Sequence, residues 1–224
     1  MLQLSNYDVY IFDCDGVILD SNELKIEAMK NTLTGLFPAL YPIEECVEYF
    51  RKNFGKSRFH HITHFLNAIL TVPAEKKQEL EQMILADFSK QCRALYLLAD
   101  ITPGFFDFLE QCQGRKYVAS GSEQGELRDV FTERGLDNYF DGIFGSPTPK
   151  AELIKQILET EQNINAVMFG DAESDMLSAQ ANQIDFVFYA PYSNVKHKML
   201  KLCSELKYLV IDDFSTVEFT YEPK

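Results

Sequence analysis

The sequence lacks the features of membrane and nucleic-acid-binding proteins. No apolar stretch reaches membrane-spanning length, and the segment Met1–Asp8 contains neither a basic leader nor a long apolar run. No run of lysine or arginine interrupts a formal net charge of −13, so a nucleic-acid backbone or an anionic membrane is not an expected partner. We therefore expect a soluble, cytoplasmic protein that acts as a monomer.

Cysteine is also scarce and carries no pairing pattern. The five cysteines are odd in number and form no Cys-x-x-Cys motif, which favours a reducing compartment over a disulfide framework (Cys14, Cys46, Cys92, Cys112 and Cys203). There is no internal repeat and no low-complexity segment. What the chain does have is 224 residues of which 46% are hydrophobic, enough for one large or two small packed domains.

The spacing of the first two strands predicts an inserted domain. Val9–Phe12 is a continuous apolar run typical of a buried parallel strand, and the next convincing strand is 116–120. The long stretch between them has apolar residues at helical spacing, in the segments 23–34, 43–53, 58–70 and 74–94. A crossover between parallel strands needs only a dozen or so residues, so we expect a helical cap domain at 20–98 and a catalytic core at 1–19 and 99–224.

From Thr102 onward the pattern alternates between helix and strand, which predicts a parallel sheet. Thr102-Pro103 is expected to cap the first helix of this part. The expected helices are 103–112, 123–134, 150–160, 173–182 and 194–206, and the expected strands are 116–120, 142–145, 165–170, 185–189 and 208–211. The predicted fold class is therefore α/β, with a Rossmann-like, doubly wound parallel sheet and an inserted α-helical domain.

Two carboxylates follow the first strand directly, in the run Asp13-Cys14-Asp15-Gly16. Ligands of open α/β sheets bind beyond the carboxyl ends of the strands. Two acids so close together raise one another's pKa unless a cation holds them, so the pair suggests a hard divalent ion and an anionic substrate. The alternative is a solvated Asp-x-Asp-Gly turn without a ligand.

Further polar residues are expected at the same edge of the sheet. Asp171 and Asp175, in Gly170-Asp171-x-x-x-Asp175, follow an apolar strand and begin a helix, where both acids can face the first pair or simply favour the helix N-terminus. Ser120-Gly121 ends a strand and could donate to a phosphoryl oxygen or serve as an ordinary helix cap. Lys150 stands at a helix start, against the dipole, where its charge could neutralise a carboxylate and a phosphoryl group. Mg²⁺ is the ion that prefers such an oxygen set.

Together these residues resemble the four motifs of the haloacid dehalogenase (HAD) superfamily, with a helical cap of the type found in β-phosphoglucomutase and phosphoglycolate phosphatase. The resemblance implies that Asp13 is the nucleophile that forms an aspartyl-phosphate and that Asp15 is the general acid and base, a role that favours a raised pKa. It implies that Mg²⁺ is held by Asp13, the backbone carbonyl of Asp15 and Asp171, with Asp175 either a further ligand or a partner of the ligands, and that Ser120, Gly121 and Lys150 hold the phosphoryl group.

The insert contains the residues expected to recognise the rest of the substrate. Gly55-Lys56-Ser57-Arg58 resembles the family's specificity loop, in which Arg58 would grip a distal anionic or polar group; an exposed helix arginine is the alternative. Lys25 stands where mutase-like members have a histidine, which favours hydrolysis over isomerisation. His60, His61 and His64 lack the third ligand and the glutamate of a helical zinc motif, so we expect them to shape or charge the cap surface.

The resemblance therefore implies a Mg²⁺-dependent phosphatase acting on a small phosphomonoester, a phosphosugar or a short phosphorylated acid. A phosphosugar mutase of the same fold is the alternative. A non-catalytic domain that binds a phosphorylated ligand is a more remote one, disfavoured by the intact Asp13, Asp15, Lys150 and Asp171.

Overall fold

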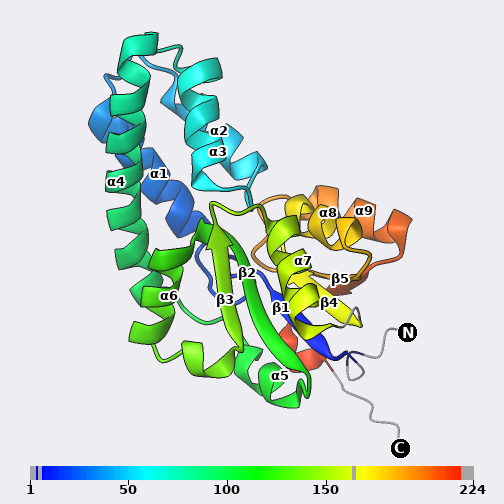
Figure 1. The fold of residues 1–224 in the computed structure, drawn as a ribbon. Coiled ribbons are helices and arrows are strands. Elements are labelled where there is room, and N and C mark those ends of the chain that lie inside the picture. The colour runs from blue at the N-terminus through cyan, green and yellow to red at the C-terminus, as the bar shows by residue number, and fades with distance from the viewer. Residues whose placement is uncertain (1–3, 5–6, 163–164, 218–224) are drawn as a thin grey trace, which may run out of the picture.

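The computed structural model describes residues 4, 7–162 and 165–217 (Figure 1). The residues 1–3, 5–6, 163–164 and 218–224, which belong to the predicted core, lie outside this description. Within the described residues the strands form a six-stranded parallel sheet in the order β3-β2-β1-β4-β5-β6. The strands are β1 (Val9–Phe12), β2 (Arg115–Glu123), β3 (Gly142–Ser146), β4 (Ala166–Gly170), β5 (Asp185–Tyr189) and β6 (Leu209–Ile211). The predicted doubly wound parallel sheet is confirmed.

Helices cover both faces of this sheet because its strands are apolar on both sides. The core helices are α5 (Phe105–Gln111), α6 (Gln124–Glu133), α7 (Lys150–Glu161), α8 (Glu173–Ala181) and α9 (Lys196–Leu206), with 3₁₀ turns at Asp137–Tyr139 and Phe214–Thr216. The buried residues of α7, α8 and α9 share one apolar cluster with Val9 and Ile11, whereas those of α5 and α6 share another with Tyr10 and Phe12. Because successive side chains of β1 point to opposite faces of the sheet, this strand contributes residues to both apolar clusters.

The expected helix cap at Thr102 is wrong. Helix α5 begins at Phe105, after Gly104 at a φ of 72°. The Thr102 hydroxyl donates instead to the carbonyl of Val17 at 2.6 Å, and the Thr102 amide donates to the carbonyl of Ile18 at 3.0 Å. Thr102 therefore joins the chain before α5 to the turn after β1, which competes with capping.

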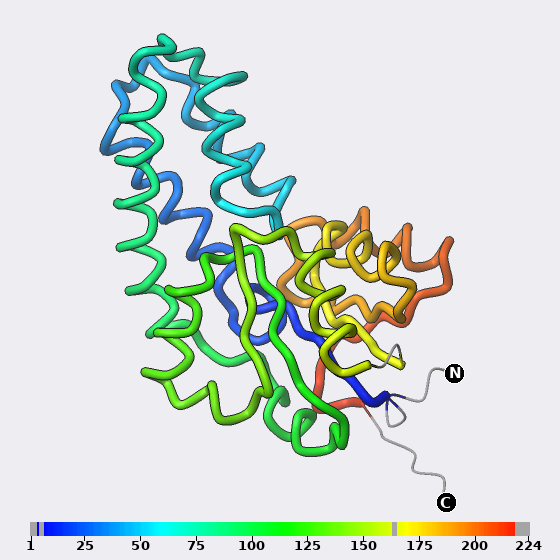
Figure 2. Tube along the Cα trace, in the orientation of Figure 1, coloured from blue at the N-terminus to red at the C-terminus, as the bar shows by residue number. Residues whose placement is uncertain are grey.

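The helices between β1 and α5 stand on the carboxyl end of the sheet (Figures 1 and 2). They are α1 (Asn22–Leu36), α2 (Ile43–Lys52), α3 (Arg58–His64) with a π-helical turn at Phe65–Ile69, and α4 (Ala74–Leu98), and we call them the helical insert. The two connections between insert and core pair with each other, through a bridge between Leu19 and Ile101. No helix of the described ranges is both long and apolar enough to cross a membrane.

The register of the sheet places the candidate site residues near one level. Phe12 pairs with Val118 of β2 on one side and with Phe169 of β4 on the other. β1 ends at Phe12, and the Asp13 amide continues the pairing by donating to the Phe169 carbonyl at 2.9 Å. Asp13, Ser120 and Asp171 come together at this edge although they are far apart in the sequence.

Candidate active site

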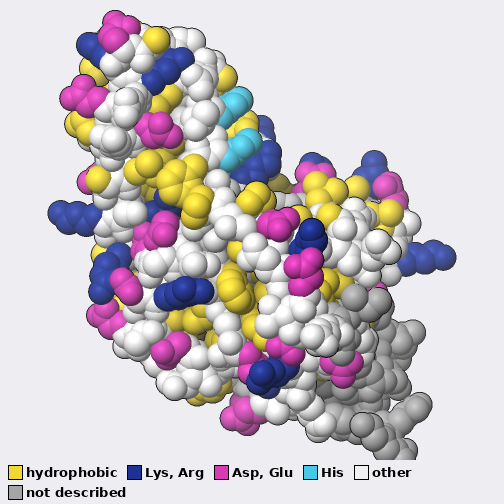
Figure 3. Space-filling model, viewed as in Figure 1, with side chains coloured by type: hydrophobic (Ala, Val, Ile, Leu, Met, Phe, Trp, Pro, Cys, Tyr) yellow, Lys and Arg dark blue, Asp and Glu magenta, His cyan; other side chains and the backbone are white. Residues whose placement is uncertain are grey.

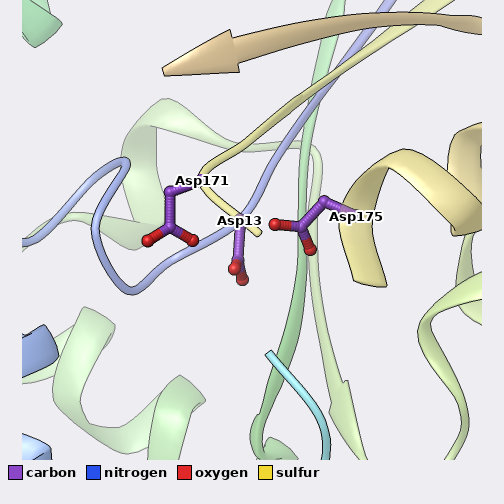
Figure 4. Close-up of side chains that lie close together, drawn as sticks. All are labelled: Asp13, Asp171 and Asp175. Carbon is purple, nitrogen blue, oxygen red and sulfur yellow. The ribbon is translucent and has the colours of Figure 1, made fainter. Parts of the chain in front are cut away.

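Three buried carboxylates converge at the carboxyl end of the sheet. Asp13 follows β1, Asp171 follows β4 and Asp175 lies in the first turn of α8 (Figure 4). Each offers an oxygen within 4.8 Å of the others, and their side chains are almost completely buried. The sharp turn after β1 depends on Gly16, whose φ is 74°, because an added Cβ there would lie 2.4 Å from Asp171 Oδ2.

Lys150 is the cation that contacts this cluster. It is the first residue of α7, it is buried, and its Nζ lies 3.0 Å from Asp13 Oδ1 and forms a close ion pair with Asp175 Oδ1. Burial alone would lower the pKa of Lys150, but the charges of Asp13 and Asp175 outweigh it and raise the pKa, so the ammonium stays charged. The expected placement of Lys150 beside the first aspartate is therefore observed.

One ammonium does not balance three buried carboxylates. Burial raises the pKa of Asp13 to about 7; Lys150 opposes this shift, while Asp175 and Asp15 add to it. Burial, followed by the charges of Asp175 and Asp13, also raises the pKa of Asp171 well above its usual range. Asp171 Oδ1 is buried without a hydrogen-bond partner in the described part of the chain. An all-oxygen donor set with an orphaned carboxylate oxygen fits Mg²⁺.

Asp15 is held in a separate network that points to the insert. Its carboxylate lies 2.8 Å from Lys25 Nζ of α1 and accepts hydrogen bonds from Ser21, Tyr96 and Ser122 at 2.6, 2.9 and 3.0 Å. Burial would raise the pKa of Asp15, but the charge of Lys25 and the hydrogen bonds from Lys25, Ser21 and Tyr96 outweigh it and hold the pKa below its usual value. The expected raised pKa is therefore wrong for this arrangement, because donors from the insert stabilise the ionised form.

Ser120 and Gly121 lie inside β2 rather than at its end. The strand continues to Glu123 with an irregular register after Ala119, and Glu123, not Ser120, caps α6 through a hydrogen bond from the Glu126 amide. Ser120 is buried, and its oxygen accepts from the Ser122 amide at 3.1 Å. The alternative of an ordinary serine cap is therefore excluded.

Gly121 is where the core touches the loop at Gly55–Ser57 of the insert. A Cβ at this position would lie 2.7 Å from the carbonyl oxygen of Gly55, so only glycine fits beneath this loop. The side chain of Lys56, in the same loop, lies on the exposed side, and its Nζ is 3.2 Å from Asn53 Oδ1. The insert is closed onto the sheet edge at this point.

Arg58 is buried, but its guanidinium is already paired. It donates to Glu126 of α6 at 2.8 and 3.2 Å and to Ser89 of α4 at 2.6 Å. The exposed-arginine alternative is wrong, since the side chain is only 3% exposed. Because Glu126 belongs to the core, this pair joins the insert to the core.

The three histidines of the insert contact aromatic side chains. Tyr49 stacks on His64 with ring centroids 3.8 Å apart and approaches His60 Nε2 with its hydroxyl at 3.1 Å. His61 is fully buried beside Phe50 and Phe54, so the expectation that it lies on the cap surface is wrong. Histidine side chains are visible on the flank of the insert that faces the α8 side of the molecule (Figure 3).

A small cavity lies between the carboxylates and the insert. It has room for roughly one water molecule. Its lining combines core and insert residues: Asp13, Asp15, Lys25, Phe50, Phe54, Gly55, Lys56, Arg58, His61, Phe88 and Gly121. A wider cleft of about 320 Å³ opens between the loop at Gly55–Ser57 and the start of α7, next to Lys150. A phosphate ester larger than water enters this cavity only if the insert moves away.

Comparison with known proteins identifies the family. The model of the haloacid dehalogenase-like hydrolases matches residues 10–189. The chain belongs to this family. The prediction made from the four motifs is confirmed, and the matched segment contains every carboxylate of the site.

Relatives of this HAD-like hydrolase have similar length and fold. A phosphoglycolate phosphatase from Colwellia psychrerythraea is 24% identical over 200 residues, which cover 83% of this chain and 85% of that protein. A β-phosphoglucomutase from Clostridium difficile has a TM-score of 0.68 at 19% identity, with 95% and 94% of the two chains covered. CbbY from Rhodobacter sphaeroides in complex with xylulose 1,5-bisphosphate has a TM-score of 0.73 at 18% identity, with 94% and 96% covered.

Several site residues of this HAD-like hydrolase were not anticipated from the sequence. Asn22 donates to Asp171 Oδ2 at 2.6 Å, and Ser21, Tyr96 and Ser122 surround Asp15. Three of these residues are close to motif residues in the sequence, and this proximity could have indicated that they belong to the site: Ser21, Asn22 and Ser122. Tyr96 and Glu126 lie on helices without a motif, so no local pattern pointed to them.

The Arg58–Glu126 pair should contribute measurably to stability. Glu126→Gln leaves the buried guanidinium without its counter-charge, and we expect the free energy of unfolding to fall by about 2–4 kcal/mol. Chemical denaturation followed by circular dichroism measures this change. The control is Glu133→Gln, which breaks an exposed pair with Arg93 between the same helices α4 and α6 and should cost less than about 1 kcal/mol. Equal losses in the two variants would contradict a special role for the buried pair.

Proposed function

We propose that this HAD-like hydrolase is a Mg²⁺-dependent phosphoric monoester hydrolase that works through an aspartyl-phosphate intermediate. The observation that carries the proposal is the buried cluster of Asp13, Asp171 and Asp175 around Lys150. A cation there would neutralise the carboxylates, which otherwise repel one another, and would attract a phosphoryl group beside them. We also propose that residues 1–19 and 99–224 form the catalytic core and that residues 20–98 form its cap.

Asp13 is the proposed nucleophile. Its carboxylate oxygen bonds to phosphorus while the bond from phosphorus to the leaving oxygen breaks, and the leaving alkoxide takes a proton from Asp15. Water then attacks the phosphorus and gives a proton to Asp15, the bond to Asp13 breaks, and inorganic phosphate leaves. Ser120, the backbone at Gly121 and Lys150 hold the phosphoryl oxygens and balance their charge.

Asp13, Asp171, Asp175 and the backbone carbonyl of Asp15 would hold Mg²⁺. The ion would supply charge neutralisation for the phosphoryl group and for the crowded carboxylates. For its first step Asp15 must exchange the Lys25 ammonium for the leaving oxygen, which would also raise its pKa toward that of a general acid. Lys25 therefore couples the position of the insert to the protonation of Asp15.

The proposed substrate is a small phosphorylated metabolite, either a phosphosugar or a short phosphorylated acid. The phosphoglycolate phosphatase relative supports the second class, and the xylulose bisphosphate complex of CbbY supports the first. The closed insert favours a ligand small enough to be enclosed.

Phosphate release from a panel of sugar phosphates, phosphoglycolate, nucleotides and pyrophosphate tests this proposal. We expect steady release with Mg²⁺ and a fall to background after chelation with EDTA, reversed by excess Mg²⁺ but not by Ca²⁺, whose looser coordination suits the site poorly. Interconversion of phosphosugar isomers without net phosphate release would instead identify a mutase. Absence of any Mg²⁺-dependent turnover across the panel would contradict the proposal.

A further inference from the structure

Two of the three cationic side chains in the lining of the small cavity, Arg58 and Lys25, are paired with carboxylates of the chain itself, and the third, Lys56, reaches Asn53 on the exposed side of its loop. Arg58 uses both terminal nitrogens on Glu126, and the two side chains are only 3% and 10% exposed. Lys25 is paired with Asp15. The insert side of the cavity therefore offers no unpaired positive charge from Arg58 or Lys25 to a second anionic group of a substrate.

His61 is the polar group of this lining that has no partner. Both ring nitrogens are buried and make no hydrogen bond within the described residues, and the ring packs against Phe50 with centroids 4.6 Å apart. Burial, followed by the charges of His60 and Lys25, lowers the pKa of His61 to about 3, so the ring is neutral at physiological pH. A neutral imidazole has one N–H donor and one nitrogen acceptor, and leaving both unpaired in the interior is costly.

A hydroxyl group matches this imidazole better than an anion does. A hydroxyl both donates and accepts, so it can pair with either ring nitrogen in either tautomer. A carboxylate or phosphate only accepts, and it would lie among the rings of Phe50, Phe54 and Phe88, where the guanidinium of Arg58 is already paired with Glu126.

Closure of the insert would strengthen the preference for a hydroxyl group over an anion. The cavity has little free volume, so a substrate enters with the insert displaced, which separates Arg58 on α3 from Glu126 on α6. When a ligand with an uncharged far end is enclosed, the pair forms again. When the far end is an anion, it competes with Glu126 for Arg58. Either this anion or the Glu126 carboxylate is then left buried without a full counter-charge.

We propose that His61, together with the Arg58–Glu126 pair, makes this enzyme select phosphomonoesters whose far end carries hydroxyl groups over those that end in a carboxylate or a second phosphate. The inference rests on the phosphatase function proposed above and narrows its substrate classes to phosphosugars with a single phosphate. His61 contacts a substrate hydroxyl, and Glu126 acts as the internal competitor that disfavours an anionic end.

Matched substrates test this selection. Glycerol 3-phosphate and 3-phosphoglycerate differ only in a CH₂OH or a carboxylate at the far end, and glucitol 6-phosphate and 6-phosphogluconate form the same pair on a six-carbon chain. We expect the alcohol to exceed the acid in kcat/KM by roughly tenfold or more in at least one pair. A preference for the acid in both pairs would overturn the inference.

Two variants assign the preference to the named residues. His61→Phe keeps an aromatic ring but removes both nitrogens, and it should lower the alcohol-to-acid ratio of kcat/KM by roughly tenfold, mainly through KM for the alcohol. Glu126→Gln should lower the same ratio by raising kcat/KM for the acid. The control is His64→Phe, which keeps the stack on Tyr49 and should leave the ratio unchanged. An unchanged ratio in His61→Phe would overturn the inference.

Folding and catalysis are separated from selection by two further measurements. His61→Phe should unfold at the same temperature as the wild type or a higher one, since it removes two unpaired buried nitrogens. Calorimetry of the four esters on an Asp13→Asn variant should show the same alcohol preference in Kd, whether or not turnover is observed. If no ester is hydrolysed by the wild type but the binding preference is present, the phosphatase proposal fails and the selection stands. If phosphate is released without the preference, only the selection fails.

Discussion

Asp13→Asn is expected to abolish phosphate release. The amide cannot attack phosphorus, and loss of a covalent nucleophile commonly lowers kcat by about 10⁴-fold or more. The residual rate with excess Mg²⁺ measures the effect. A variant that retained a tenth of the wild-type rate would show that another group, or water directly, attacks the substrate.

The intermediate provides an independent readout of the same residue. Acid quenching of the wild type during turnover of a radiolabelled phosphate ester should leave label on the protein, and hydroxylamine should remove it as expected of an acyl phosphate. Asp13→Asn should retain none. The matched control is Asp129→Asn, an exposed aspartate on α6, which should leave both rate and labelling unchanged. Asp13→Asn should remain folded, since it removes one charge from a cluster of buried carboxylates that repel one another.

The core half of the site could be predicted from the sequence because topology alone brings its residues together. Asp13 and Asp171 each follow a buried strand directly, and parallel neighbouring strands end at one edge of a sheet. A functional role for Lys150 was predictable because a lysine at the start of a helix opposes the helix dipole and so has no structural reason to be there. The positions of the strands were predictable for the same reason, since apolar runs bounded by polar residues leave little choice of register, but β2 extends to Glu123 beyond the predicted end at residue 120.

The insert half could not be predicted, because its contacts depend on how the helices pack. The motif that contains Arg58 indicates a substrate contact, but nothing local indicates that Glu126 lies within 2.8 Å of it. The lowered pKa of Asp15 has the same origin, since Lys25 and Tyr96 reach it from helices α1 and α4. Burial of His61 was also missed, because helical spacing does not distinguish a face that packs on a neighbouring helix from one that faces solvent.

Lys25→Met is expected to destabilise the protein strongly. Asp15 would remain buried with hydroxyl donors but without its cation, and breaking a buried ion pair by removal of one partner typically costs about 3–5 kcal/mol. Methionine keeps most of the aliphatic length of lysine, so the decrease in the free energy of unfolding would result from the lost charge and not from lost side-chain volume. Chemical denaturation at neutral pH, without Mg²⁺ and substrate, measures the change. The control is Lys155→Met, which breaks an exposed pair with Glu159 and should cost less than about 1 kcal/mol.

The double variant Lys25→Met, Asp15→Asn separates this ion pair from other effects of the lysine. Without the carboxylate there is no unpaired charge, so the second substitution should restore part of the lost stability, and additive losses would contradict the pairing. The pH dependence has a defined sign. Because the folded pKa of Asp15 is lowered, the wild type gains stability from this group above the unfolded pKa and loses it as the pH falls through the folded pKa. Lys25→Met raises that pKa, so the stability difference between the two proteins should be largest at neutral pH and should shrink as the pH falls through the pKa of Asp15 in the variant.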